Sequence, residues 1–204
     1  MDEHLTETRI DSRLVYDGHF LKVRKDTVSL PDGKLTGREY IVHPGAVVIL
    51  PVFDDGRILL ERQFRYPLDR VFLEYPAGKI DAGEDTLACA KRELQEETGY
   101  TASHWQHLST IHNAIAYSDE HLEIYLARGL TAGPDRLDEG EFLETFTATL
   151  PELMAWVREG KITDVKTVIG TVWLEKILAW TWAGSYTPLT LPTILLWWMT
   201  GGAV

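Results

Sequence analysis

The chain has 204 residues, of which 45% are hydrophobic and 25% are charged, a balance that is typical of a globular protein. Its formal net charge of −11 argues against general binding to nucleic acids, because such binding needs basic patches. The single cysteine, Cys89, excludes an intrachain disulfide, which is compatible with the cytosol. We therefore expect a cytoplasmic protein that has no nucleic-acid partner.

The N-terminal part of the chain is predicted to be rich in strands. Its beginning, MDEHLTETRIDSR, lacks the apolar core of a secretory signal. Residues 14–30 alternate partly between apolar and polar side chains around an Asp17-Gly18 turn, which predicts strands. Residues 35–42 continue this sheet after a second turn. We expect a strand-rich extension over residues 1–40.

The middle of the chain is predicted to form one α/β domain over residues 41–180. Residues 46–53, AVVILPVF, are almost continuously apolar, as in a buried strand. Gly170 is interpreted as the weak point of the last helix, since glycine lowers helix propensity. The remaining elements that we expect are strands at residues 57–64, 71–75, 100–111 and 122–127, and helices at residues 150–159 and 167–178.

The C-terminal segment has no charged residue from Ile177 onward. A membrane helix needs about 20 mostly apolar residues, and this stretch is long enough. Pro188 and Pro192 interrupt it, however, so we do not expect a membrane span. The sequence leaves open whether the apolar tail at residues 181–204 covers the core, forms an interface or is poorly ordered.

One continuous run, GKIDAGEDTLACAKRELQEETGY at residues 78–100, is the most informative part of the chain. Glu93, Glu96 and Glu97 are spaced i, i+3 and i+4, which places them on one face of a helix. Like charges so placed repel, and the cluster therefore indicates a cation between them. Hard oxygen ligands of this kind suggest Mg²⁺, with Mn²⁺ as an alternative. The other interpretation is an acidic surface helix that ends at a glycine.

The same run contains the signals of a helix that can pack on a sheet. Asp85 or Thr86 can cap its first turn, because either side-chain oxygen can accept from free amides. Gly99 suits the left-handed position just beyond its end. An apolar stripe lies beside or opposite the acids and is formed by Leu87, Ala90 and Leu94. The helix can therefore bury one side while it directs its carboxylates to a site.

The spacing Gly-x5-Glu-x7-Arg-Glu-hydrophobic-x-Glu-Glu-x-Gly-hydrophobic resembles the signature of the Nudix hydrolases. This chain fills it without a departure, at Gly78, Glu84, Arg92, Glu93, Leu94, Glu96, Glu97, Gly99 and Tyr100. The resemblance covers roughly residues 40–178. Flanking segments are similar to the ADP-ribose pyrophosphatase branch, namely HPGAV at 43–47, ERQFRY at 61–66, EYPAG at 74–78 and YSDE at 117–120.

The resemblance implies an α/β/α sandwich, in which helices cover a mixed sheet and the signature forms a loop, a helix and a loop. It implies that Glu93 and Glu97 are the main metal ligands and that Glu96 completes the cluster. The backbone carbonyl of Ala77 is implied as a further ligand. It also implies a homodimer that pairs through its N-terminal strands.

Further site residues follow from the same resemblance. Arg92 is expected to pair with Glu84, since a guanidinium and a carboxylate can form two parallel hydrogen bonds. Glu120 is expected to be a catalytic base or an additional metal ligand. Gln63 and Arg65 are expected to face the substrate, with Arg65 at a phosphate. Glu139 and Glu141 also resemble residues near the active site, or else they are solvated loop acids.

The chain departs from the branch at one position. Where the branch carries Ser-Pro-Gly before the loop acid, this chain has Ala114-Ile115-Ala116, so the proline associated with ADP-ribose preference is absent. The expected reaction is metal-dependent hydrolysis of ADP-ribose, or a related nucleoside diphosphate sugar, to AMP and ribose 5-phosphate. The alternatives are another nucleoside diphosphate derivative, or a non-catalytic nucleotide sensor on the same fold. His43 and His112 are interpreted as structural or surface groups, because neither has a partner at ligand spacing.

Overall fold

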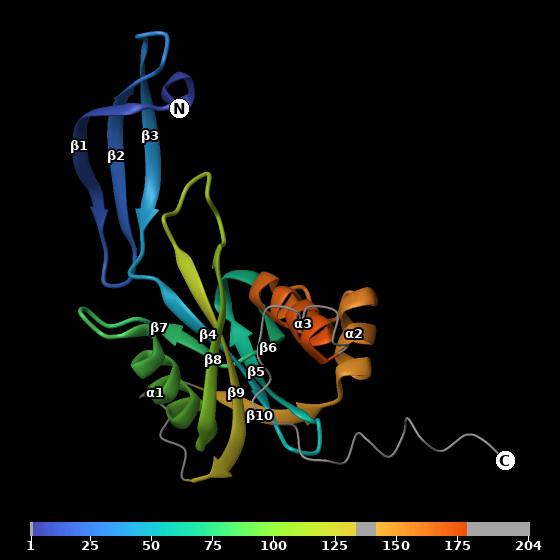
Figure 1. The fold of residues 1–204 in the computed structure, drawn as a ribbon. Coiled ribbons are helices and arrows are strands. Elements are labelled where there is room, and N and C mark those ends of the chain that lie inside the picture. The colour runs from blue at the N-terminus through green and yellow to red at the C-terminus, as the bar shows by residue number, and fades with distance from the viewer. Residues whose placement is uncertain (1, 134–141, 179–204) are drawn as a thin grey trace, which may run out of the picture.

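The computed structural model describes residues 2–133 and 142–178 (Figure 1). Glu139, Glu141 and the tail at 181–204 lie outside the described residues. After a short 3-10 turn, η1 (Glu3–Leu5), the chain forms an antiparallel sheet in the order β1-β2-β3. Its strands are β1 (Thr8–Asp17), β2 (Lys22–Ser29) and β3 (Leu35–Val42). Figure 1 shows this sheet projecting from one end of the rest of the molecule.

The other strands of the described chain form one mixed sheet in the order β10-β5-β4-β9-β8, with β6 paired to β5 and β7 paired to β4. β4 and β9 run parallel, whereas the other pairs are antiparallel. The 3-10 turn η2 (Tyr66–Leu68) joins β5 to β6. The strands are β4 (Ala46–Val52), β5 (Ile58–Arg65), β6 (Arg70–Glu74), β7 (Ala77–Lys79), β8 (Tyr100–His112), β9 (His121–Ala132) and β10 (Leu143–Ala148).

Helices cover both faces of this mixed sheet. In Figure 1, α1 (Thr86–Thr98) lies on one side of it, and α2 (Leu150–Arg158) and α3 (Val165–Leu178) lie on the other. The predicted α/β/α sandwich is therefore confirmed. Within the described residues, no helix is long and apolar enough to cross a membrane.

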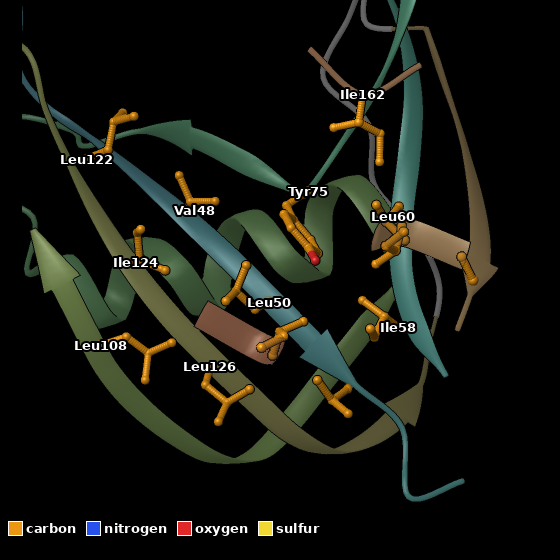
Figure 2. Packing of buried hydrophobic residues seen from close by; sticks show 14 of the residues in the cluster. Val48, Leu50, Ile58, Leu60, Tyr75, Leu108, Leu122, Ile124, Leu126 and Ile162 are labelled. Atoms are coloured by element: carbon orange, nitrogen blue, oxygen red, sulfur yellow. The ribbon is translucent and has the colours of Figure 1, made fainter. Parts of the chain in front are cut away.

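The central strand β4 explains why the sheet has a core on each face. All seven of its residues are buried, and alternate side chains point to opposite faces of the sheet. Val48 and Leu50 belong to the cluster under α2 and α3, which Figure 2 shows, whereas Val47 and Ile49 pack with α1. An apolar run without alternation is thus what a strand between two layers requires.

Gly170 also has a packing role that the sequence did not predict. A Cβ atom at this position would lie 2.6 Å from Cδ2 of Leu50 and 2.9 Å from Cε2 of Tyr75. The glycine therefore allows α3 to lie close to β4 at this point. Two short strands, β7 and β10, were not expected, because three and six residues carry little pattern of their own.

Candidate active site

Local signals place the helix that carries the acids. Of the two candidate caps, Asp85 is the one used, since its Oδ1 accepts from the backbone N–H groups of Leu87 and Ala88 at 3.0 and 3.1 Å. Gly99 ends the helix with φ of 73°, as its left-handed position requires. Between these two residues, Ala90 and Leu94 are fully buried against the sheet. The acids lie on the remaining part of the helix surface, which contacts β7 and the loop before the helix.

Arg92 gathers three carboxylates of the signature. Its Nε and Nη2 donate to the two oxygens of Glu84 at 2.9 and 2.8 Å. Its Nη1 donates to Glu93 at 2.7 Å and to Glu96 at 3.0 Å. The expected pairing of Arg92 with Glu84 is thus present, and it joins the loop to the helix. The hydrogen bonds from Arg92 lower the pKa of Glu84 to about 2, and the same contacts raise the pKa of Arg92.

Glu97 lies deeper than the other acids and connects the helix to β7. It is only 4% exposed, and its Oε2 accepts from the backbone N–H of Ala77 at 3.0 Å. The next residue, Gly78, approaches the helix so closely that a Cβ atom there would overlap the Glu93 carboxylate. The absence of a side chain at Gly78 therefore allows the Glu93 carboxylate to occupy this position. The fold places Ala77 and Gly78 beside two of the predicted metal ligands, as the signature requires.

The acids fit a divalent cation in the chemistry of their side chains. Among the described residues, no three Asp, Glu, His or Cys side chains converge on one point as a ready-made metal site. The guanidinium of Arg92 accounts for this, because it draws Glu84, Glu93 and Glu96 onto its own nitrogens. Glu93 and Glu96 nevertheless meet at a single nitrogen of Arg92, and carboxylate oxygens are the donors that hard cations prefer.

Glu120 lies directly before β9, on the loop that joins β8 to β9. Its Oε2 accepts from Nδ2 of Asn113 at 3.2 Å, and its backbone N–H donates to Oγ of Ser118 at the same distance. Its Oε1 is 3.7 Å from Nε2 of His43. Sequence reasoning had interpreted His43 as a structural or surface group, and only the fold reveals its position beside Glu120.

Gln63 and Arg65 lie on β5, and Arg65 makes a strong pairing that the sequence did not predict. Its Nε and Nη2 donate to both oxygens of Glu74 at 2.8 and 2.7 Å, and this pairing raises the pKa of Arg65. Glu74 is 2% exposed and also pairs with Lys166. Burial alone would raise the pKa of Glu74, but the two cations outweigh it and lower the pKa. The EYPAG segment that begins at Glu74 was the available sequence signal.

Comparison with known protein families decides to which family the chain belongs. Residues 42–167 match the model of the NUDIX domain. The chain belongs to the Nudix family. Residues 7–41, which include the projecting sheet, match the nucleoside diphosphate sugar hydrolase N-terminal domain. As a Nudix hydrolase, the chain is a pyrophosphohydrolase that works with a divalent metal ion.

Several known proteins are similar to this Nudix hydrolase over most of its length. The ADP-ribose pyrophosphatase of Bacillus subtilis (strain 168) is 36% identical over 173 residues, which are 84% of this chain and 94% of that protein. The methanol dehydrogenase activator of Bacillus methanolicus is 35% identical over 177 residues, or 86% of this chain and 96% of that protein. A solved structure, described as an ADP compounds hydrolase, has a TM-score of 0.78 at 23% identity and covers 87% of this chain and 97% of its own. This last likeness concerns the fold.

Proposed function

We propose that this Nudix hydrolase cleaves the diphosphate bond of ADP-ribose to give AMP and ribose 5-phosphate. The observation that carries the proposal is the group of signature acids around Arg92, since such a cluster suits metal-assisted attack of water on a diphosphate. The choice of ADP-ribose is supported by the Bacillus subtilis relative, which is named for that activity and is matched over 94% of its length.

Glu93, Glu96 and Glu97 are the side chains that we propose as metal ligands, together with the backbone carbonyl of Ala77. Mg²⁺ is the cation we propose, and Mn²⁺ the alternative, because both prefer oxygen donors. When bound, the cation neutralises charge on the phosphoryl oxygens and lowers the pKa of water. The hydrogen bond from the Ala77 N–H to Glu97 supports this set, because it fixes one proposed ligand against another.

Glu120 is proposed to accept the proton of the attacking water, with an additional metal ligand as its alternative role. The water oxygen bonds to phosphorus while one water proton passes to a Glu120 oxygen and the bond to the leaving phosphate breaks. Support comes from its accessibility, since its side chain is 22% exposed and has a fixed partner in Asn113. Arg92 holds Glu84 and thereby keeps the loop in place against the acidic helix.

Gln63 and Arg65 are proposed to contact the substrate. Glu74 occupies Nε and Nη2 of Arg65, so Nη1 is the nitrogen left to reach a phosphate. The Arg65 side chain is 42% exposed, which supports such a contact. For Glu139 and Glu141, a role near the active site stays a prediction.

A second candidate substrate is another nucleoside diphosphate derivative, such as a dinucleotide. The observation that favours it is Ile115, which stands in the loop before Glu120 where the branch carries proline and is 83% exposed. A non-catalytic nucleotide sensor would fit a degenerate signature better than this complete one.

We further propose a homodimer that pairs through the N-terminal sheet. Exposed apolar side chains on β1 support it, among them Ile10, Leu14, Val15 and Tyr16. The domain division near residue 40 is supported by the two family matches, which meet at residues 41 and 42. A cytoplasmic location is proposed from the single cysteine. Sedimentation velocity would test the dimer, and a monomer at micromolar concentration would contradict it.

The decisive experiment is a substrate panel with Mg²⁺ and with EDTA, with products identified by chromatography. The panel holds ADP-ribose, a sugar nucleotide, a diadenosine polyphosphate and an oxidised nucleoside triphosphate. We expect Mg²⁺-dependent release of AMP and ribose 5-phosphate from ADP-ribose. Selective turnover of another panel compound would identify that compound as the substrate in place of ADP-ribose. Nucleotide binding that raises the melting temperature without any turnover would favour the sensor.

The variant Glu97→Gln tests the role of the acids. It keeps the shape and one oxygen for the Ala77 N–H, but it removes the negative charge of a proposed ligand. We expect turnover to fall at least about 100-fold, as when a preorganised electrostatic partner is lost. Glu159→Gln is the matched control, because Glu159 lies on the surface and pairs only with Lys161 among the described ion pairs. Full Mg²⁺-dependent turnover by Glu97→Gln would refute the assignment.

A further inference from the structure

The loop that carries Glu120 is attached to the end of the N-terminal sheet. The backbone N–H of Ile41 donates to the carbonyl oxygen of Tyr117 at 2.8 Å, and the backbone N–H of Asp119 donates to the carbonyl oxygen of Ile41 at 3.3 Å. Ile41 and Ser118 form a parallel bridge at this point. Figure 1 shows the loop between β8 and β9 reaching toward the lower end of β3. The main chain just before Glu120 is therefore paired with the end of β3.

A second contact fixes His43 against the same loop. The backbone N–H of His43 donates to Oδ1 of Asp119 at 2.7 Å, across 76 positions of sequence. Its ring packs edge-on to Phe20 of the β1–β2 connection, with the ring centroids 6.4 Å apart. The His43 side chain is only 13% exposed. Both the backbone and the ring of His43 are thus held in place.

The hydrogen bonds of the His43 ring determine which nitrogen faces Glu120. Its Nδ1 accepts from the backbone N–H of Gly45 at 3.1 Å, so the hydrogen of the neutral ring is on Nε2. Gly45 has φ of +91°, which favours glycine and fixes this turn of the chain. The Nε2–H group therefore points its hydrogen toward the Glu120 side of the ring.

We propose that His43 is a positioning residue, which orients the Glu120 carboxylate through Nε2. The carboxylate lies between two donors, with Nε2 of His43 3.7 Å from Oε1 and Nδ2 of Asn113 3.2 Å from Oε2. The first distance is longer than a direct hydrogen bond. It can be bridged by one water molecule, or a small movement of the loop can shorten it to hydrogen-bond length. The inference rests on the proposed role of Glu120 and adds the residue that sets its direction.

Two substitutions separate this role from a purely structural one. His43→Gln can place an amide N–H near the position of Nε2, whereas His43→Asn keeps only an acceptor near the position of Nδ1. A positioning role therefore predicts that His43→Gln keeps a kcat near that of the wild type and that His43→Asn lowers it. A role limited to accepting the Gly45 N–H predicts the reverse. Each variant is purified as the full chain, and its melting temperature is measured beside the wild type.

Steady-state kinetics are measured on the panel compound that the wild type hydrolyses fastest. The test of His43 is then independent of whether ADP-ribose is the substrate. We expect His43→Asn to lower kcat about 10- to 100-fold with KM within about twofold, because misplacement by about 1 Å costs up to about 100-fold. We expect His43→Gln to stay within about threefold of the wild type. The control His104→Ala alters an exposed histidine on β8, which contacts Ser103, and should keep full activity.

The Glu120→Gln background completes the test as a double-mutant cycle. If His43 acts through Glu120, adding His43→Asn to Glu120→Gln lowers kcat no further. If the double variant instead loses kcat by the product of the two single losses, the inference is overturned and the role of Glu120 stays intact. Full activity of His43→Asn alone would have the same two consequences. Full activity of Glu120→Gln would overturn the role of Glu120 and the inference together.

Discussion

Gly78 offers the sharpest test of the geometry around the acids. A Cβ atom on Gly78 would stand 1.9 Å from Cδ of Glu93, whereas ordinary contact begins at 3.4 Å. The carboxylate of Glu93 would therefore have to move away until this gap reaches the contact distance. It can do so without disturbing the backbone, because the overlap involves the far end of a flexible side chain. Gly78→Ala should consequently displace a proposed metal ligand while it preserves the fold.

A displacement of this size has a predictable effect on catalysis. Misplacement of a reacting or orienting group by about 1 Å can cost about 100-fold in rate, and we expect Gly78→Ala to lower kcat by at least that factor. The measurement is release of AMP from ADP-ribose at several Mg²⁺ concentrations, with circular dichroism and thermal unfolding as checks of the fold. The melting temperature should change by only a few degrees.

Gly37→Ala is the matched control for this variant. Gly37 lies on β3 and has no positive φ. A Cβ atom added there would have the backbone oxygen of Asp26, at 3.9 Å, as its nearest neighbour. It should therefore keep full activity. If Gly78→Ala turned over ADP-ribose at the rate of the wild type, the Glu93 carboxylate would not need its position, and the proposed metal ligand set would be refuted.

Three further predictions concern contacts that the fold creates. Arg92→Lys should destabilise the protein by about 1–3 kcal/mol and lower turnover, because an ammonium cannot form the two parallel hydrogen bonds to Glu84. Chemical denaturation would measure the change in the free energy of unfolding. The lowered pKa of Glu74 stabilises the fold above the ordinary glutamate pKa of about 4.3, and this contribution is lost as pH falls through the folded pKa. Unfolding of Glu74→Gln between about pH 2 and 5 should therefore depend less on pH. Gly170→Ala should destabilise by about 1–3 kcal/mol by crowding Leu50, although alanine favours helices, and a gain in melting temperature would contradict the packing.

The sequence alone was enough to predict the acidic helix and the type of fold. Asp85 and Gly99 mark the two ends of α1, because capping depends on backbone groups within a few residues of each cap. The apolar run of β4 indicated a buried strand, since a strand covered on both faces needs apolar side chains on both. The signature indicated the family because all of its specified positions lie in one continuous run of the chain, from Gly78 to Tyr100.

Only the tertiary structure decided the contacts between residues that are distant in sequence. The pairing of buried Glu74 with Lys166, the close approach at Gly170 and the position of His43 beside Glu120 carry no local pattern. Each depends on which strands are neighbours and on their register, which residues far apart in the chain determine together. The sequence therefore determined which acids the helix carries and that Arg92 pairs with Glu84. The packing of the sheet determined the contacts that reach the acids of the site from other elements, such as those of Ala77 with Glu97 and of His43 with Glu120.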